Sequence, residues 1–187
     1  ENPILLKVVL NKTFVFIGGF VFWKIYQPFL LNFGFSVFYL GILYLILQTS
    51  LSLWYWFSEQ VKAKIGNMAI LRFVPVIALI SAFLVFIGSN KWLVFIFSTI
   101  ILFLSSIRDP YFVEIVQNRL SSYNRATTTS VFNFFKSVFD IPVLFISGLL
   151  VAKDIKDVLL IPILLFSVTI IFLQIRNEDL IVDNREK

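Results

Sequence analysis

Six long apolar stretches, separated by short polar segments, make up most of this chain. They cover residues 14–31, 37–57, 68–88, 92 to about 116, 126–151 and 158–173. A helix needs about 20 mainly apolar residues to cross a bilayer, whereas the strands of a membrane barrel alternate polar and apolar positions. The pattern therefore predicts an all-α membrane protein in which six transmembrane helices form a single domain, residues 1–187.

The connecting segments are short and polar. We expect an interfacial lead-in at residues 1–12, a charged cytoplasmic tail at residues 174–187, and loops at residues 32–36, 58–67, 89–91, 117–123 and 153–157. The chain starts at Glu1, and no signal-like segment precedes the first apolar stretch. We therefore interpret the chain as a fragment of a longer protein.

A stripe of polar residues runs along the fifth apolar stretch at helical spacing. Its members are Arg125, Thr129, Asn133, Lys136, Asp140 and Ser147. An α-helix turns about 100° per residue, so these side chains share one face of an otherwise apolar helix. A charge near the middle of a bilayer costs about 2.5–3.5 kcal/mol on insertion scales. Because Lys136 and Asp140 place two such charges well inside the stretch, we expect the stripe to face a cavity, a partner helix or a substrate.

Lys136 and Asp140 in this stripe allow two interpretations. They are four residues apart, so they could form an intrahelical ion pair that only lowers the cost of insertion. They could instead form the wall of a cavity that binds a substrate or couples to an ion. The remaining polar members of the stripe favour the cavity wall.

The other apolar stretches differ sharply in polarity. The third and sixth are almost pure hydrocarbon apart from Arg72, so we expect them to be peripheral. The others hold candidate pathway residues and are expected to be central. Outside the stripe, these candidates are Lys24, Gln27, Gln48, Ser52, Tyr55, Arg108, Asp109 and Glu114.

Polarity also repeats along the chain, with two polar stretches and one apolar stretch in each half. Pro75 and Pro162 lie near the start of the two apolar stretches. A unit of three spans is odd in number, so its second copy would be inverted in the membrane. Two inverted three-helix repeats around a central polar site are typical of transporters.

Composition excludes several classes of function. Hydrophobic residues make up 59% of the chain and charged residues only 14%, so too little polar sequence exists to cover a soluble globule. There is no cysteine and no histidine, so we expect no disulfide, no zinc or other metal site, no His-based triad and no cofactor. No basic cluster is present that would indicate nucleic-acid binding.

The distribution of Lys and Arg predicts the orientation in the membrane. One side of the predicted topology carries Lys7, Lys12, Lys62, Lys64, Arg119, Arg125, Arg176, Arg185 and Lys187, and the other carries Lys91, Lys153 and Lys156. Positive residues are enriched on the cytoplasmic side. We therefore expect a multi-pass protein of the plasma (cell inner) membrane with both termini in the cytoplasm.

Two groups of motifs resemble the C-terminal half of bacterial major facilitator superfamily transporters of the multidrug-efflux type. The first reads Arg108-Asp109-Pro110, Gln117-Asn118-Arg119-Leu120, then Asn124-Arg125-Ala126-Thr127 and Ser130. The second reads Tyr26-Gln27-Pro28, Gly34-Phe35-Ser36 and Gly41. The resemblance covers about residues 2–173 and implies the last six of twelve helices. It also implies an N-terminal six-helix half as partner, with Arg125, Ala126, Thr127 and Ser130 as family motif.

One loop departs from the family pattern. Between the second and third helices of a half, the family often carries a Gly, an acidic residue and several Arg. Here residues 58–66 keep only Glu59, Lys62, Lys64 and Gly66. The departure removes a means of identifying the gating contacts.

Several candidates keep an alternative interpretation. Arg108 and Asp109 are adjacent and point about 100° apart, so they serve one surface only if Pro110 distorts the helix; Arg108 is the better cavity candidate. Lys24 is either a side chain that extends to the outer headgroups or, with Gln27, part of a cavity mouth. Glu114 is either interfacial or a partner of a neighbouring helix.

The sequence thus favours secondary transport of a small molecule by alternating access, as ion- or proton-coupled efflux. Asp109, Glu114 or Asp140 could carry the proton, because a carboxylate in a low dielectric has a raised pKa. The alternative is a six-helix assembly or receptor subunit that does not transport. An intramembrane aspartyl protease would need Asp109 and Asp140 to face each other, and the Gly-x-Gly-Asp setting of such enzymes is absent. We therefore expect no enzyme.

Overall fold

The computed structural model of the chain describes residues 3–112 and 125–175, and this part is helical without any strand. Over its described residues, each apolar stretch of the sequence contains a helix. In chain order these elements are α1 (Pro3–Asn32), α2 (Val37–Ile65), α3 (Asn67–Ile87), α4 (Lys91–Ile107), α6 (Arg125–Lys153), the 3₁₀ turn η1 (Asp157–Leu159) and α7 (Leu160–Phe172).

Four helices in the described ranges are long and apolar enough to cross a membrane. They are Leu6–Asn32, Val37–Ile65, Asn67–Ile87 and Lys91–Phe112. These helices indicate a membrane protein, as the sequence predicted. The stretch Asp157–Phe172, which contains α7, is apolar but shorter. The count of six spans and the inverted repeats therefore stay predictions.

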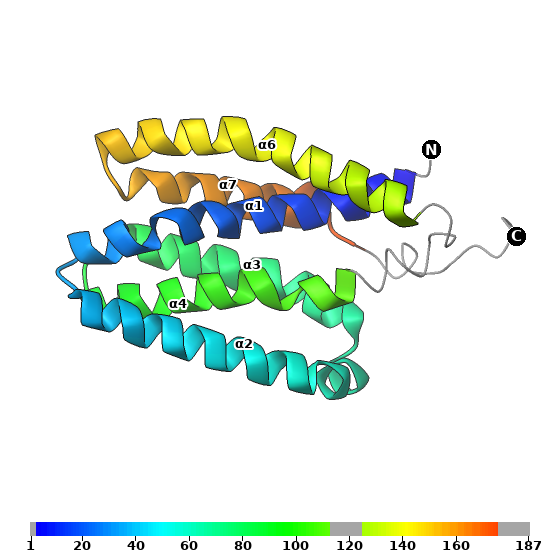
Figure 1. Cartoon of the computed structure of the whole chain (residues 1–187), viewed down its shortest axis with the longest axis horizontal. Coiled ribbons are helices and arrows are strands. Elements are labelled where there is room, and N and C mark those ends of the chain that lie inside the picture. Colours follow the sequence, from blue (N-terminus) through cyan, green and yellow to red (C-terminus); the bar gives the residue numbers. More distant parts are fainter. Residues whose placement is uncertain (1–2, 113–124, 176–187) are drawn as a thin grey trace, which may run out of the picture.

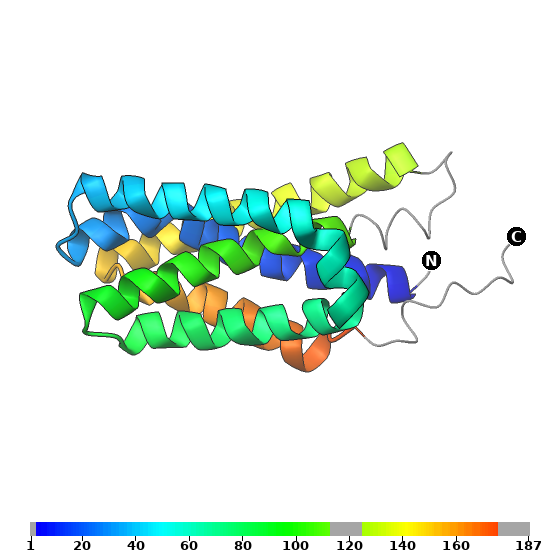
Figure 2. The same ribbon diagram turned by 90° about the horizontal axis from the view of Figure 1, so that it is seen from below.

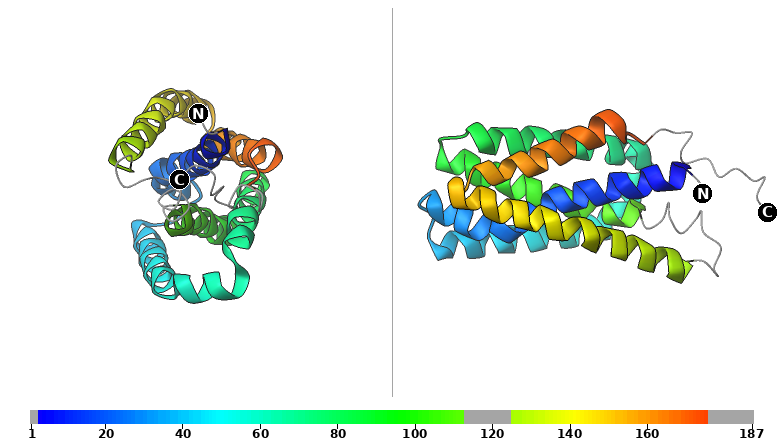
Figure 3. Two further views of the ribbon diagram at one scale, coloured as in Figure 1. Left: turned by 90° about the vertical axis from the view of Figure 1, so that its right-hand side faces the viewer. Right: turned by 90° about the horizontal axis from the view of Figure 1, so that it is seen from above.

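The helices form an elongated bundle in which successive helices along the chain run in opposite directions (Figures 1 and 2). The helices α1, α3, α4 and α7 pack in a ring, with α1 against α4 and α7, and α3 against the same two helices. The other two helices lie outside this ring: α2 packs mainly on α4, and α6 packs on α1. Seen end-on, α2 and α6 project from the same side and stand apart from each other (Figure 3).

Two adjacent glycines bring α1 close to both of its neighbours in the ring. A Cβ atom on Gly19 would overlap Ser105 of α4, and one on Gly18 would lie 2.8 Å from the Phe166 ring of α7. Glycine usually weakens a helix interior. Here the absence of a side chain allows the close packing of three helices.

The cytoplasm-facing end of α4 in the predicted topology contains a joint. The helix stops at Ile107, Arg108 caps it, and helical structure resumes over residues 109–112. A proline at position 110 has no N–H and disrupts the helical hydrogen bonds before it. The carbonyls of Ser106 and Ile107 are instead bonded from α2, by Tyr55 Oη at 3.4 Å and Trp54 Nε1 at 3.1 Å.

The two ends of the bundle differ. At the end that we call the loop end, the chain connects α1 to α2, α3 to α4 and α6 to α7 (Figure 1). Lys156 joins these connections, because its Nζ donates to the Gly88 carbonyl at 3.0 Å and lies 5.0 Å from the Phe33 ring centroid. At the opposite, terminal end, α1 begins and α7 ends (Figure 1).

One predicted boundary was wrong. Residues 58–65, expected as loop, continue α2 as far as Ile65, because Glu, Gln, Lys and Ala are good helix formers and the helix ends only at Gly66, whose φ is +82°. The interfacial lead-in expected at residues 1–12 stays a prediction, and its described residues, from Pro3 on, belong to α1. The predicted tail and the loop at residues 117–123 lie outside the described residues, apart from residues 174 and 175.

Candidate functional site

The candidate site lies on one side of α1 and α4. This side faces outward between the projecting helices α2 and α6, and we call it the inter-arm face. Three cavities lie between these helices, one between α1 and α2, one between α1 and α4, and one between α2 and α4. Their volumes are about 510, 230 and 180 Å³. The first is within the range of small-molecule sites in proteins.

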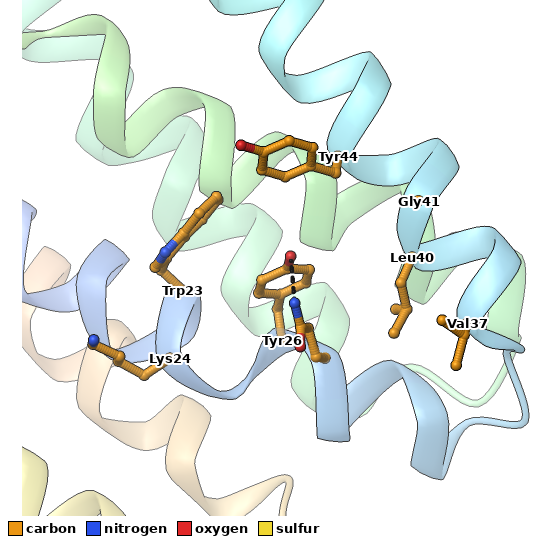
Figure 4. Close-up of a pocket in the computed structure, with 8 residues that line it drawn as sticks. Trp23, Lys24, Tyr26, Val37, Leu40, Gly41 and Tyr44 are labelled. Atoms are coloured by element: carbon orange, nitrogen blue, oxygen red, sulfur yellow. Dashed lines mark hydrogen bonds between the residues drawn. The ribbon is translucent and has the colours of Figure 1, made fainter.

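The largest of these three cavities is lined by aromatic rings and a few polar groups. Its lining consists of Trp23, Lys24, Tyr26, Gln27, Val37, Leu40, Gly41 and Tyr44. Figure 4 shows Trp23, Lys24 and Tyr26 on α1 and, across from them, Tyr44 on α2. Gln27 Nε2 donates to Tyr26 Oη at 3.1 Å. Lys24 lies at the edge of the cavity and points away from Leu40 and Val37 (Figure 4).

The second cavity adjoins the first, because Trp23 lines both. Its remaining lining is Phe16, Gly19, Phe20, Leu102, Ser105, Ser106 and Asp109. Asp109 is 46% exposed and forms an ion pair with Lys12 of α1, with Nζ and Oδ1 3.5 Å apart. The missing side chain at Gly19 thus both allows the helices to approach and contributes to the cavity surface.

The third cavity is mostly apolar. Leu47 and Ser50 come from α2, and Thr99, Ile100 and Phe103 come from α4. Thr99 Oγ1 donates to the Phe95 carbonyl of its own helix at 2.9 Å, so its hydroxyl hydrogen is already used there.

Two lysines from different helices lie on one pair of stacked phenylalanines. The rings of Phe16 and Phe20 stack with centroids 5.6 Å apart at 20°. Lys136 Nζ from α6 is 3.6 Å from the Phe16 centroid, and Lys24 Nζ is 4.9 Å from the Phe20 centroid. Such contacts stabilise a cation by about 0.5–2 kcal/mol. We call these four residues the lysine–phenylalanine stack.

Asp140 lies near this stack but forms no direct ion pair with either of its lysines. The carboxylate interacts electrostatically with both Lys136 and Lys24. Among the described residues, however, neither lysine forms an ion pair with it within 4 Å, and its buried Oδ1 has no hydrogen-bond partner. The intrahelical ion pair considered for Lys136 and Asp140 is therefore not the geometry observed.

Arg108 lies in a different environment from the other candidates. It is only 2% exposed and lies at the terminal end of the ring. Its Nη2 donates to Asn11 Oδ1 at 2.7 Å and to the Leu71 carbonyl at 3.1 Å, and its guanidinium lies 4.7 Å from the Phe112 centroid. Within the described ranges, Nε and Nη1 have no hydrogen-bond partner.

This arginine belongs to a network that joins the helix ends. Asn11 Nδ2 donates to the Leu173 carbonyl at 2.7 Å, and Arg72 Nε donates to the Ile175 carbonyl at 3.1 Å. The network thus connects α1, α3, α4 and the end of α7. Arg108, which the sequence favoured as a cavity residue, lines none of the three cavities described above.

The remaining predicted residues have varied positions. Asn133 and Ser130 are exposed on α6, Gln48 and Ser52 are exposed on α2, and Tyr55 bonds to α4 as described. Ser147 is buried and donates to the Val143 carbonyl of its own helix at 2.7 Å.

Other predicted positions cannot be placed. Glu114 lies outside the described residues, and of Arg125, Ala126, Thr127 and Thr129 only the helical backbone is described.

Sequence reasoning missed the aromatic half of the site. Phe16, Phe20, Lys24 and Gln27 follow one another at helical steps of four, four and three, so they share one face of α1. This stripe could have been recognised by its spacing. It was hidden because phenylalanine occurs 23 times in the chain.

Comparison with known proteins identifies no relative of this chain. No protein-family model, no curated protein and no solved structure matches it. The site must therefore be interpreted from its own geometry.

Proposed function

We propose that this chain is one six-helix half of a membrane transporter, which moves a small molecule by alternating access against an N-terminal half. In this proposal the inter-arm face lines the substrate pathway and the projecting helices α2 and α6 contact the partner half. In this proposal the chain spans the plasma membrane, and both of its termini lie in the cytoplasm. The described part of the bundle supplies one wall of the pathway.

The observation that carries this proposal is the unequal distribution of charge around the bundle. Lys24, Lys136, Asp140 and Asp109 gather on the inter-arm face, where the three cavities lie. The opposite side, on α3, exposes Phe73, Ile77, Ile80 and Phe83. Polar and ionisable groups within a membrane protein usually line a pathway or a site, and an apolar face suits contact with lipid.

Coupled efflux follows from the resemblance and from the two carboxylates. Asp109 lines the second cavity, and Asp140, on a different helix, interacts electrostatically with Lys24, which lines the first. A carboxylate that binds and releases a proton in each conformation would link transport to the proton gradient. This part of the proposal rests on sequence motifs rather than on the cavities.

Solvent accessibility of single cysteines tests the proposal, because the chain has no native cysteine. Cysteines are placed at Asn133, Lys136 and Asp140 of the full-length protein in membranes, with Ile77 and Ile80 of α3 as matched exposed controls. We expect a water-soluble maleimide to label the first three and not the controls. If none of the three is labelled, the polar stripe is sealed and the non-transporting assembly is the better proposal.

Flux completes the test. The six-helix chain is expressed together with its N-terminal half, and uptake or efflux of candidate substrates is compared with that of either half alone. Flux that appears only with both halves supports transport. Accessible cysteines without flux of any substrate would favour a receptor role.

A further inference from the structure

The lysine–phenylalanine stack carries more positive than negative charge. Lys24 and Lys136 supply two cations, and Asp140 is the carboxylate that interacts with both of them. Asp109 is already paired with Lys12 at 3.5 Å, at the terminal-end side of the face. One positive charge on this part of the inter-arm face thus has no matching anion among the described residues.

The two ammonium groups also have donors to offer. An ammonium group has three N–H donors. The phenylalanine ring contacts only one side of the ammonium group, so N–H donors on its other side remain available. Of the hydrogen bonds in the described ranges, none is donated by Lys24 or Lys136 to an oxygen. A charge-assisted hydrogen bond from each lysine to an incoming anion would therefore replace water without displacing a protein partner.

The neighbouring cavity provides room for an apolar body. Its volume is about 510 Å³, and Trp23, Tyr26 and Tyr44 give it aromatic walls (Figure 4). Lys24 lines the same cavity at its edge. A flat apolar group could lie between these rings while an attached anionic group reaches the lysine.

We propose, resting on the transport function proposed above, that this site selects organic anions with an aromatic or other planar apolar body. The anionic group, a carboxylate or phosphate, binds Lys24 and Lys136 beside the stacked phenylalanines. The apolar body occupies the cavity between α1 and α2. A cationic amphipath of the same shape binds less well, because it meets two ammonium groups and a single carboxylate.

The probes for the test are naphthoate, naphthylmethanol and naphthylmethylamine, which share one apolar body and differ in charge. The full-length protein, with a single cysteine at Gly41, which lines the cavity without forming an aromatic wall and has room for a side chain, is placed in phosphatidylcholine vesicles, and labelling by a water-soluble maleimide is timed. We expect naphthoate to slow the labelling by about tenfold at a concentration where the other two have little effect, as one charge-assisted hydrogen bond allows.

Lys24→Met provides the main variant and Lys91→Met its matched control. Lys91 is also exposed near the loop end, with its ammonium 5.9 Å from the Phe35 ring and 5.6 Å from the Trp92 ring, but it does not line the cavity. We expect Lys24→Met to abolish protection by naphthoate, Lys24→Arg to keep it, and Lys91→Met to leave it unchanged.

Each other outcome overturns the inference. Equal protection by all three probes would show an apolar cavity without charge selection, and stronger protection by the amine would assign recognition to Asp140. Absence of protection by any probe would show that the cavity binds no such ligand. Lys24-dependent protection by phosphatidylglycerol vesicles without any probe would identify a lipid headgroup, not a soluble anion, as the occupant.

The outcome is separable from that of the proposed function. If cysteines at Asn133, Lys136 and Asp140 are labelled but naphthoate gives no selective protection, transport stands and anion selectivity fails. If those three cysteines are not labelled at all, the proposed function itself fails.

Discussion

Arg108 and Lys136 are both cations beside a phenylalanine ring in a bundle of mainly apolar helices, yet they differ in burial and in hydrogen bonding. Arg108 is 2% exposed and bonds to side-chain and backbone oxygens from two other helices. Lys136 is half-buried, lies 3.6 Å from the centroid of a phenylalanine ring, and forms no ion pair with the carboxylate four residues away.

The contrast separates two uses of charge in one fold. A sealed cation with fixed oxygen partners holds helices together, and its removal leaves those partners buried and unsatisfied. A cation on an accessible face adds little to packing and stays available to a ligand. Four substitutions, ordered by their expected effect on the free energy of unfolding, test whether this division is correct.

Gly19→Leu should have the largest effect, because both regions depend on the position of α1. The new side chain would overlap Ser105 of α4, and overpacking of this kind costs about 1–3 kcal/mol or more. Thermal unfolding in detergent measures the loss. The matched control is Gly148→Leu, because a Cβ added at Gly148 would meet no atom of another helix within 4 Å. Equal stability of the two variants would show that the α1–α4 contact is not tight.

Arg108→Ala should follow, with a loss of about 1–3 kcal/mol, because the Asn11 and Leu71 oxygens are left buried without this donor. Arg72→Ala, which removes one hydrogen bond from a half-buried side chain, should cost less. We also expect Arg108→Ala to reduce transport more than Arg72→Ala, through loss of folded protein. Unfolding curves and flux per folded molecule separate the two effects, and equal effects of the variants would contradict the assignment.

Trp54→Phe should cost about 1 kcal/mol, the net contribution of a typical hydrogen bond. The substitution keeps an aromatic ring and removes the donor to the Ile107 carbonyl. Trp56→Phe is the control, because Trp56 is 81% exposed on the same helix. If both variants unfold at the same temperature, the α4 joint does not depend on α2.

Asp140→Asn should have the smallest effect on stability, within about 0.5 kcal/mol. Its effect on transport should be large, because the amide cannot carry a proton or balance Lys24 and Lys136. Flux in proteoliposomes, with insertion checked by protease protection, measures this. Normal flux in a correctly inserted variant would exclude a coupling role for Asp140.

The sequence allowed the helices and part of the site to be predicted, because both are local patterns. The stripe on α6 is visible from spacing alone, and the prediction that Arg108 and Asp109 point apart agrees with one being buried and the other 46% exposed. The structural role of Arg108, which links helix ends through hydrogen bonds, could not be predicted. Its partners Asn11 and Leu71 are distant in sequence, and only packing brings them together.

The aromatic half of the site was missed for a different reason. Phe16 and Phe20 are chemically identical to the many phenylalanines that pack in the core or face outward. Their role depends on Lys136, which comes from another helix. The polar segment before Gly66 was misread because its residues suit either a solvent-exposed loop or an exposed helical turn.

The contact of Lys156 with Gly88 has a practical consequence for chemical footprinting. Lys91 and Lys153 are exposed at the loop end, so an amine-directed reagent should modify them quickly. Lys156 would react only when its bond to the Gly88 carbonyl opens. Mass spectrometry of these three lysines at successive times would therefore report how often the loop end loosens in an intact membrane, without any engineered residue.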